Sequence, residues 1–538
     1  MATPRRPSPS ASPRWFPLCA AIFFAALILR LGYALAQPVW TSADSGYYVM
    51  VARNLYRGRG FISDYIWNYL AGLPAGLPAP SNEYWMPGQS VVVAAAFAVA
   101  RSTALRVAQV PSLVLSALLC AITAWMAGLL SRRRDVALLA GAMAAVSFHL
   151  AGTALYPDHF GLVACLVNLS LLALWAAWRG SPTLALVAGG IAGLAYLTRN
   201  DGALLGVVAL FLAFDVWRKR GLRPAAGYAL CFGGAFALIA APWWVRQYSV
   251  FGHLAGAGAL RTAYLTSYND LFRLDQSHLD LSHYLQTSQT FAAMFKGYVL
   301  FTELRLLAKV VGVAGLLALV ALRRAELRRE ATPWLVYLGL GLLAPAFIVP
   351  YPTVKGGFWH LMPGLCPILF GLGAGEAVRI FEWGRQQKRS LLKAAAWSPA
   401  VLSLAWLLAW WAALPQEVAR GASPSYPLAA REAARALQPP LHAALTDDCW
   451  GLYEVARVPC AQFPSDGAAA ALQVAEAIGA NYLITRADAP KRLPAITEVV
   501  GHPRFRPAAR YPTPEGAVLV YDIVPPAPSS DSRRRMSQ

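Results

Sequence analysis

Charged side chains are scarce in this sequence of 538 residues: they make up 14% of it, while 57% of the residues are hydrophobic. Soluble domains carry about 25% charged residues, so this composition excludes an ordinary soluble enzyme. Acidic residues are the rarer sign, with 27 Asp and Glu against 47 Lys and Arg. The basic residues form short clusters between apolar runs and no single basic face, so we expect no nucleic-acid partner.

Cysteine is also sparse, with 7 residues in the chain, and no Cys or His spacing matches a zinc site. Most cysteines lie in apolar runs, where a small apolar filler is the expected role. These are Cys19, Cys120, Cys165, Cys231 and Cys366. Cys449 and Cys460 lie close together near the C-terminus, and their spacing leaves open whether they form a disulfide.

Long apolar runs recur between Trp15 and Leu414. A helix of about 17–25 apolar residues crosses the ~30 Å hydrocarbon core, so the runs predict a polytopic α-helical membrane protein with about eleven spans. The predicted spans are Trp15–Ala36, Ala104–Leu130, Val136–Leu155, His159–Trp178, Pro182–Thr198, Gly202–Trp217, Pro224–Val245, Gly297–Ala321, Pro333–Pro350, Trp359–Ile380 and Ala394–Leu414. The run Pro87–Ala100 is too short to cross comfortably, and we expect it to lie in the outer interface.

Basic connectors set the predicted orientation, because Lys and Arg are enriched in cytoplasmic loops. Clusters such as Arg132 to Arg134 and Arg385 to Lys393 follow every second predicted span. An odd number of spans then puts the N-terminus in the cytoplasm and the C-terminal region outside. We therefore expect a multi-pass protein of the plasma (inner) membrane. Residues 1–14 are rich in Pro, Ser and Arg and are predicted to be a disordered cytoplasmic leader.

Two loops and a C-terminal domain are predicted outside the transmembrane domain of residues 15–414. The loops, residues 37–103 and 246–296, have a length that is usually functional. Residues 415–525 have the composition of a small extracytoplasmic α/β domain, and residues 526–538 that of a disordered tail. The predicted elements of the α/β domain are strands at Ala443–Thr446, Tyr482–Thr485 and Ala517–Ile523 and a helix at Gly467–Ile478.

Two acidic residues at the outer surface are the first candidates for chemistry. Asp44 follows the first span, in Ser-Ala-Asp-Ser-Gly-Tyr-Tyr, and Asp158 lies at the outer end of the third, in Leu-Tyr-Pro-Asp-His-Phe. A carboxylate beside the low-dielectric bilayer can have its pKa raised toward values useful for removing a hydroxyl proton. The pair could also share a divalent cation, or each could merely cap a helix. A metal or other cofactor is left open.

Basic residues on the same side are candidates for binding a phosphate. Lys355 and His360 end a span in Tyr-Pro-Thr-Val-Lys-Gly-Gly-Phe-Trp-His, although Lys355 could simply extend to the interface. Arg246 and Arg199 are exceptions to the inside-positive pattern, which makes each a candidate for binding phosphate or for a buried ion pair. For Arg199 a structural tie to Asp201 is the more frequent case. Further candidates for substrate binding are His159, Glu83 and Tyr84, whereas the expected interface aromatics are Trp85, Trp243 and Trp244.

The order of these motifs resembles a known class of enzymes. Asp44 to Phe61, Tyr84 to Gln89 and Leu155 to Asp158 are similar to membrane glycosyltransferases of the GT-C class. The likeness is to bacterial relatives of the protein O-mannosyltransferases and of the aminoarabinose transferases that act on lipid A. It implies a GT-C-like fold with Asp44 as catalytic base and Asp158 as a second acidic residue. The sequence departs at Ser45, where many relatives have an acidic residue.

The resemblance also implies a function, a glycosyltransferase with a lipid-phosphate sugar donor. We expect transfer of a sugar from polyprenyl phosphate to an acceptor hydroxyl on the outer face, with inversion. The basic residue of the late outer loop, Lys355, would meet the lipid phosphate. The sugar is left open, as is the acceptor, which could be protein, lipid or glycan. A transporter or lipid flippase is the alternative, but the inverted repeats and broken helices typical of it are not evident in the sequence.

Overall fold

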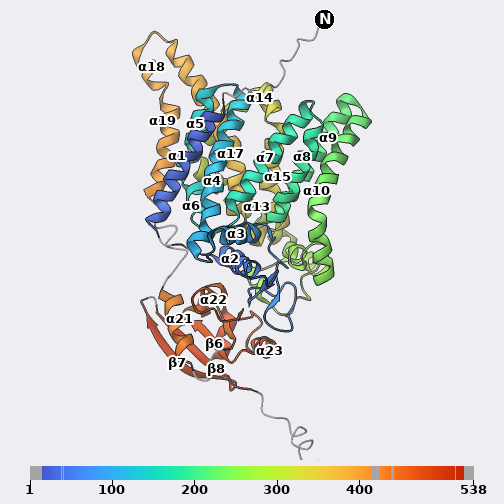
Figure 1. Cartoon of the computed structure of the whole chain (residues 1–538), viewed down its shortest axis with the longest axis vertical. Helices are drawn as coiled ribbons and strands as arrows, with labels where there is room; N and C mark the ends of the chain where they lie inside the picture. The colour runs from blue at the N-terminus through green and yellow to red at the C-terminus, as the bar shows by residue number, and fades with distance from the viewer. Residues whose placement is uncertain are drawn as a thin grey trace, which may run out of the picture.

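The computed structural model describes residues 15–37, 39, 41–412, 425–437, 442–514 and 516–525. A long helical bundle occupies one end of the molecule and a sheet domain the other. Short helices and loops lie between the two (Figure 1).

The bundle contains a helix for each predicted span. Its helices are α1 (Phe16–Leu35), α4 (Leu105–Ser131), α5 (Arg134–Val146), α6 (Phe148–Thr153), α7 (Phe160–Arg179), α8 (Thr183–Thr198), α9 (Leu204–Arg220), α10 (Leu222–Phe251), α13 (Gln289–Ala321), α15 (Thr332–Ile348), α17 (Phe358–Arg385), α18 (Ser390–Ala395) and α19 (Ser398–Ala409). Among the described residues, 8 helices are long and apolar enough to cross a membrane. The third predicted span is divided between α5 and α6, and α8 and α15 are shorter than the rest. The polytopic α-helical fold is confirmed.

Small residues allow the helices of the bundle to pack closely. A Cβ added at Gly189 of α8 would meet the backbone of Phe232 on α10, and one at Gly373 of α17 would meet the backbone of Ala314 on α13. Helices in membranes associate through such close backbone approach, because burying apolar surface gains little there. The helical segment Pro350–Arg385, which contains α17, is the most buried of the candidate spans.

One helix of the bundle is broken, which the sequence did not indicate. Within α13, Gly312 has a left-handed φ of 51°, and the indole of Trp406 on α19 fills the space beside it. Trp406 Nε1 donates to the carbonyl oxygen of Lys309 at 2.9 Å, which satisfies an acceptor in the interrupted region. A single glycine in an apolar run is common in membrane helices, so it carried no signal.

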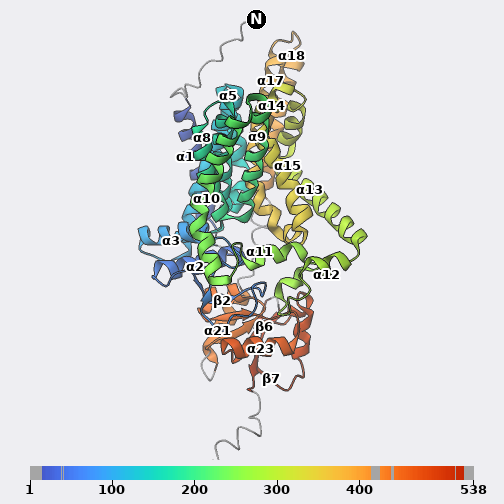
Figure 2. The same ribbon diagram turned by 90° about the vertical axis from the view of Figure 1, so that its right-hand side faces the viewer.

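Two helices of residues 37–103, the predicted first outer loop, lie across the end of the bundle (Figure 2). They are α2 (Ala43–Tyr56) and α3 (Gly88–Ala100), and α3 covers the run predicted to lie in the interface. A capping box starts α2: the Ser42 side chain accepts from Ser45 N, and the Ser45 side chain accepts from Ser42 N. The departure at Ser45 therefore has a structural role, since it fixes the turn that carries Asp44.

Shorter elements complete the region between bundle and sheet, and α14 (Ala325–Glu330) lies at the other end of the bundle (Figure 1). The elements between bundle and sheet are β1 (Ile62–Ser63), β3 (Ala79–Pro80), η1 (Asn200–Ala203), α11 (Ala257–Arg261), η2 (Thr262–Tyr264), η3 (Tyr268–Phe272), α12 (Leu281–Gln286), α16 (Pro350–Pro352) and η4 (Thr353–Gly357). In η4, Gly356 has φ 131°, which only glycine adopts without strain. The turn brings Lys355 to the N-terminal end of α17.

The C-terminal domain is built on a 6-stranded sheet of order β2-β5-β4-β6-β8-β7. Its strands are β2 (Tyr65–Ile66), β4 (Ala444–Thr446), β5 (Cys460–Gln462), β6 (Tyr482–Arg486), β7 (Phe505–Thr513) and β8 (Gly516–Ile523). The flanking helices are α21 (Ser425–Ala436), α22 (Cys449–Ala456) and α23 (Ala468–Ile478). The first four strands in this order pair in parallel. Strand β8 is antiparallel to both of its neighbours, β6 and β7. The predicted strands and helix correspond to β4, β6, β8 and α23.

This domain is not a separate body, in contrast to the division drawn from the sequence at Leu414. Strand β2 comes from the first outer loop, with Tyr65 aligned with Cys460 of β5. One hydrophobic core contains Tyr47 of α2 together with Leu452 of α22. A strand of two residues is too short to show an alternating pattern, so the sequence could not predict that β2 joins this sheet.

The two cysteines of this domain are adjacent but unbonded. Cys449 and Cys460 are free and buried, and the Cys460 thiol lies 3.2 Å from the carbonyl oxygen of Cys449. The structure therefore gives them the role of core residues.

Candidate active site

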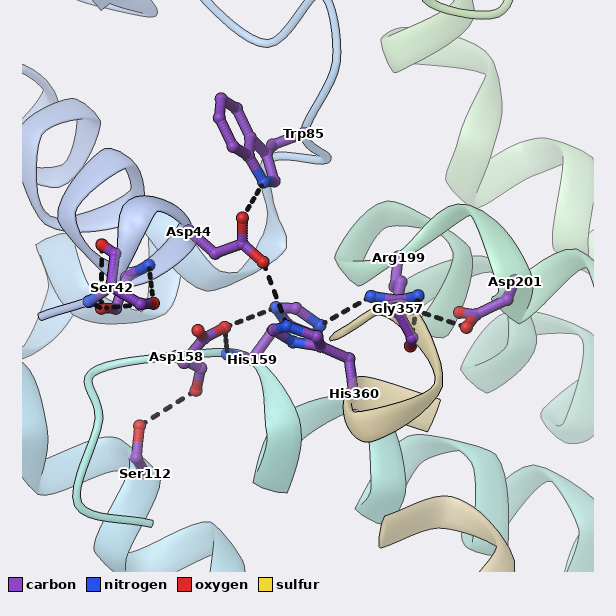
Figure 3. Close-up of polar contacts among 11 residues, drawn as sticks. Ser42, Asp44, Trp85, Ser112, Asp158, His159, Arg199, Asp201, Gly357 and His360 are labelled. Carbon is purple, nitrogen blue, oxygen red and sulfur yellow. Dashed lines mark hydrogen bonds and ion pairs between the residues drawn. The ribbon is translucent and has the colours of Figure 1, made fainter. Parts of the chain in front are cut away.

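The start of α2 presents Asp44 to a group of aromatic and imidazole side chains (Figure 3). Trp85 Nε1 donates to Asp44 Oδ1 at 2.9 Å, and His360 Nε2 lies 3.2 Å from Asp44 Oδ2. His360 comes from the first turn of α17. The carboxylate is thus held from two sides, by the first outer loop and by the bundle.

Asp158 lies near Asp44, with the His159 ring beside its carboxylate (Figure 3). It is buried, and its Oδ1 lies 2.6 Å from His159 Nδ1. The backbone oxygen of Asp158 accepts from Ser112 Oγ at 3.0 Å. The rings of His159 and His360 stack with centroids 4.9 Å apart. The sequence placed both carboxylates at one surface, and the structure joins them through two imidazoles.

Arg199 adds a cation to this group. Its Nε donates to Asp201 Oδ2 at 2.6 Å, which is the tie expected from the sequence. Its Nη2 also donates to the Gly357 carbonyl at 3.2 Å, and its Nη1 lies 3.4 Å from His159 Nε2. Because the guanidinium lies beside both η4 and His159, Arg199 belongs to the site and is more than the tie to Asp201 that the sequence favoured.

These side chains surround a cavity of about 410 Å³. The lining residues with polar or aromatic groups include Asp44, Tyr48, Trp67, Tyr84, Trp85, His159, Arg199, Asp201, Tyr268, Lys355 and His360. Lys355 Nζ lies 5.4 Å from the centre of the Tyr268 ring. Five predicted site residues, Asp44, His159, Lys355, His360 and Tyr84, therefore meet at one cavity.

A second cavity of about 370 Å³ lies on the other side of η4. Its lining comes from α13, η4 and the start of α17, and it includes Leu306 and Phe358 as well as the buried carboxyl group of Glu303. Lys355 and Gly356 line both cavities, so η4 is the wall between them. The two cavities thus share one lysine side chain.

Glu83 and Arg246 do not belong to the described lining of the central cavity. Arg246 Nη2 donates to the carbonyl oxygens of Phe61 at 3.2 Å and Ser81 at 3.0 Å. Its guanidinium carbon lies 4.8 Å from the centre of the Trp243 ring. The basic residue that breaks the inside-positive pattern thus holds this loop, residues 37–103. The Phe61 carbonyl also accepts from the backbone N–H of Ser81 at 3.0 Å, so Arg246 adds a second donor there.

The environment separates the two aspartates. Burial raises the pKa of Asp44 to about 6, and the nearby Asp158 carboxylate adds to the increase. Burial opposes ionisation of Asp158 as well, but the contacts with His159 leave its pKa below the usual value. Asp44 is therefore the carboxyl group that can exchange a proton near neutral pH, while Asp158 stays charged.

Asp158, His159 and His360 also fit the donor set of a metal site. Each offers one ligand atom, and these atoms lie within 4.8 Å of one another. Carboxylate and imidazole donors suit divalent ions such as zinc. The sequence paired Asp44 with Asp158 for such an ion, whereas the grouping in the structure replaces Asp44 with two histidines.

The same architecture occurs in known structures. No protein-family model and no curated protein matches the sequence. The Archaeoglobus fulgidus oligosaccharyltransferase in complex with zinc and sulfate matches with a TM-score of 0.59 at 12% identity, over 94% of this chain and 74% of that one. ArnT from Cupriavidus metallidurans bound to undecaprenyl phosphate matches with a TM-score of 0.56 at 14% identity, over 96% and 100%.

A third match is the arabinofuranosyltransferase AftD from Mycobacteria, with a TM-score of 0.52 at 17% identity over 96% of this chain and 42% of that one. All three are membrane glycosyltransferases of the GT-C class. This chain has the GT-C fold. At these identities the match concerns the fold, and the resemblance seen in the sequence motifs is confirmed at that level.

Proposed function

We propose that this protein transfers a sugar from a polyprenyl-phosphate carrier to an acceptor hydroxyl at the outer face of the membrane. The observation that carries the proposal is the position of Asp44 on the wall of the central cavity, within 3.2 Å of His360 and in the same cavity as Lys355. The sugar and its acceptor would meet in that cavity.

The neighbouring structures support a lipid-phosphate donor. ArnT was crystallised with undecaprenyl phosphate, and the archaeal oligosaccharyltransferase AglB has been solved with an inhibitory peptide and a dolichol phosphate. In this chain the cavity beside α13, where Leu306 and Phe358 offer apolar surface, would take the first part of the carrier's chain. Lys355, which lines both cavities, would then lie at the phosphate between chain and sugar.

The reaction we propose is a direct displacement. Asp44 takes the proton of the acceptor hydroxyl, whose oxygen attacks the anomeric carbon as the bond from that carbon to the phosphate oxygen breaks. Lys355 and Arg199 stabilise the negative charge on the departing phosphate, which leaves on its carrier. One displacement inverts the anomeric centre. Tyr84 lines the cavity and would contact the acceptor.

A cation held by Asp158, His159 and His360 would add positive charge next to the phosphate. The residues themselves fit that role, but the displacement does not depend on it.

The orientation belongs to the same proposal. Asp44, the long loops and the sheet domain lie at one end of the bundle (Figures 1 and 3), and the clusters of basic residues between spans favour the other end for the cytoplasm. A transporter is less well supported, because a base and a cation meet here in a chamber at one end of the bundle rather than at its middle.

The test is incubation of the purified protein with a panel of polyprenyl-phosphate sugars, with release of the carrier phosphate as the readout. Release that needs an acceptor hydroxyl is the expected result. The Lys355→Ala variant should bind the donor about tenfold more weakly and also turn over more slowly, since this charge meets the phosphate in both ground and transition states. The matched control is Lys219→Ala, which removes a lysine paired with Asp215 on α9. No release with any donor of the panel would refute the proposal.

A further inference from the structure

The indole that contacts Asp44 belongs to a buried turn with an unusual backbone. Trp85 is 6% exposed, and its ring packs on Tyr47 with centroids 4.2 Å apart. Three residues earlier, Asn82 is buried and has a φ of 68°, in the left-handed region. Outside glycine, this conformation is held only where surrounding contacts stabilise it, and asparagine tolerates it best among the other residues.

The side chain of Asn82 closes this turn onto Trp85. Asn82 Nδ2 donates to the Trp85 carbonyl oxygen at 3.0 Å. Ser81 Oγ donates to Asn82 Oδ1 at 2.7 Å, which orients the amide so that its NH₂ group faces Trp85. The backbone N–H of Asn82 donates to the Tyr47 hydroxyl oxygen at 2.7 Å. Each of these polar groups is buried, so losing one partner leaves an unsatisfied group.

The membrane bundle holds the same turn from its other side. Gln247, which is 2% exposed in the last turns of α10, donates through Nε2 to the Asn82 carbonyl oxygen at 2.7 Å. Arg246 holds the neighbouring Ser81 carbonyl. A continuous series of hydrogen bonds thus runs from α10 through Asn82 and Trp85 to the carboxylate of Asp44 (its last step is drawn in Figure 3).

We propose that Asn82 is a positioning residue that orients Asp44 through the Trp85 indole. The inference rests on the proposed function, in which Asp44 is the base. A carboxylate rotates about its Cβ–Cγ bond unless both oxygens are held, and here Trp85 holds Oδ1 while His360 holds Oδ2. The turn at Asn82 fixes the place of the indole, and α10 fixes the turn. Asn82 itself does not line the cavity among the described residues, so it acts on the base without touching substrate.

A double-mutant cycle tests this chain of contacts. Trp85→Phe keeps the ring packing but removes the donor to Asp44, and kcat should fall about tenfold or more with KM for the donor little changed. Asn82→Gly suits the left-handed backbone and removes only the side chain, and kcat should fall about threefold to tenfold. In the Trp85→Phe background, Asn82→Gly should cost little more, because its route to Asp44 is already cut.

A matched control shows whether that loss of effect is specific. Trp244 donates through Nε1 to the Tyr196 hydroxyl at 3.1 Å, on α10 but away from the described lining of the cavity. In a Trp244→Phe background the full effect of Asn82→Gly should remain. Equal effects of Asn82→Gly in all three backgrounds, or a rise in KM without loss of kcat, would overturn the positioning role.

A spectroscopic measurement separates this inference from the proposed reaction. In protein labelled with ¹⁵N-tryptophan, the Trp85 indole N–H resonance is identified by its loss in Trp85→Phe. It should move in Asp44→Asn and also in Asn82→Gly, whether or not a donor has been found. If it moves in neither variant, the contact is absent and the inference fails. If it moves as expected while no donor releases carrier phosphate, only the proposed function fails.

Discussion

The membrane bundle and the outer assembly of this protein are stabilised in different ways. The outer assembly consists of α2, the loop that follows it and the C-terminal sheet domain. In the bundle, neighbouring helices touch through small residues such as Gly189 and Gly373, and each helix is already indicated by its own apolar run. In the outer assembly, residues hundreds of positions apart form one sheet and one core. Each helix of the scaffold is thus set locally, although the core of the bundle also joins distant residues such as Ile22 and Leu407. Strand β2 and the place of α2 depend on distant contacts alone.

Polar contacts also tie α2 and its loop to the C-terminal domain. Arg53 of α2 is buried and forms a bidentate ion pair with Glu454 of α22, at 2.6 and 3.0 Å. Tyr453 donates to Asp64 of the first outer loop at 2.7 Å. Trp450 packs against Gly46, two residues after Asp44. The C-terminal domain therefore supports the helix that presents the candidate base, and it is more than an appendage.

The largest effect should come from removing the C-terminal domain. A chain that ends at residue 412 loses the partners of β2 and half of the core around Tyr47. We expect no detectable sugar transfer, because α2 would no longer hold Asp44 in place, while the helical bundle stays folded in detergent by circular dichroism. Transfer near the rate of the full chain would break the comparison, since it would make the two parts independent.

Asp44→Asn should come next. Asparagine keeps the shape but cannot accept the acceptor's proton, and loss of a general base typically costs about 10²–10⁴-fold in turnover. Donor binding should be retained, since Lys355 is unchanged. Single-turnover transfer and donor binding measure the two effects. The control is Asp135→Asn, at an exposed aspartate paired with Arg133. Near-normal transfer by a folded Asp44→Asn protein would remove Asp44 from the chemistry.

Glu454→Gln tests the tie between α2 and α22. It leaves the Arg53 guanidinium buried without its charged partner, and breaking a buried ion pair in this way costs about 3–5 kcal/mol. We expect the outer assembly to unfold at a lower temperature, as measured by tryptophan fluorescence. The rate of sugar transfer should fall as well. Glu476→Gln breaks an exposed pair with Arg504 in the same domain and should change stability by less than about 1 kcal/mol. Equal effects of the two changes would argue against a special tie.

The smallest effect concerns pH. A base must be ionised to act, so the raised pKa of Asp44, about 6, predicts that transfer falls as the pH drops through that value. At one pH unit below it, the rate should be about tenfold lower than the plateau. Burial also raises the pKa of Glu83, to about 7, but this residue does not line the described cavity. The acid limb should therefore be unchanged in Glu83→Gln. If the acid limb disappears in Glu83→Gln, the titrating group is Glu83 and not Asp44.

The positions of the membrane helices and several site residues were predictable from the sequence. Apolar runs mark the helices because each backbone must satisfy its own hydrogen bonds in lipid. Asp44, Lys355 and His360 were found because polar groups at the ends of such runs stand out. Arg199 was found but read as a tie, and the structure adds its contacts with Gly357 and His159. Arg246 stood out for the same reason, yet its partners are loop carbonyls.

The sequence by itself determined the helical bundle, the strands β4, β6 and β8, and the candidates at the membrane surface, because those signals are periodic or compositional and lie within short segments. Only the tertiary structure decided that β2 joins the C-terminal sheet, that Trp85 is a partner of Asp44 rather than an interface aromatic, and that two histidines stand between the aspartates. These features arise from contacts between segments far apart in the chain. No local pattern encodes them, since each depends on how loops are folded back against the bundle.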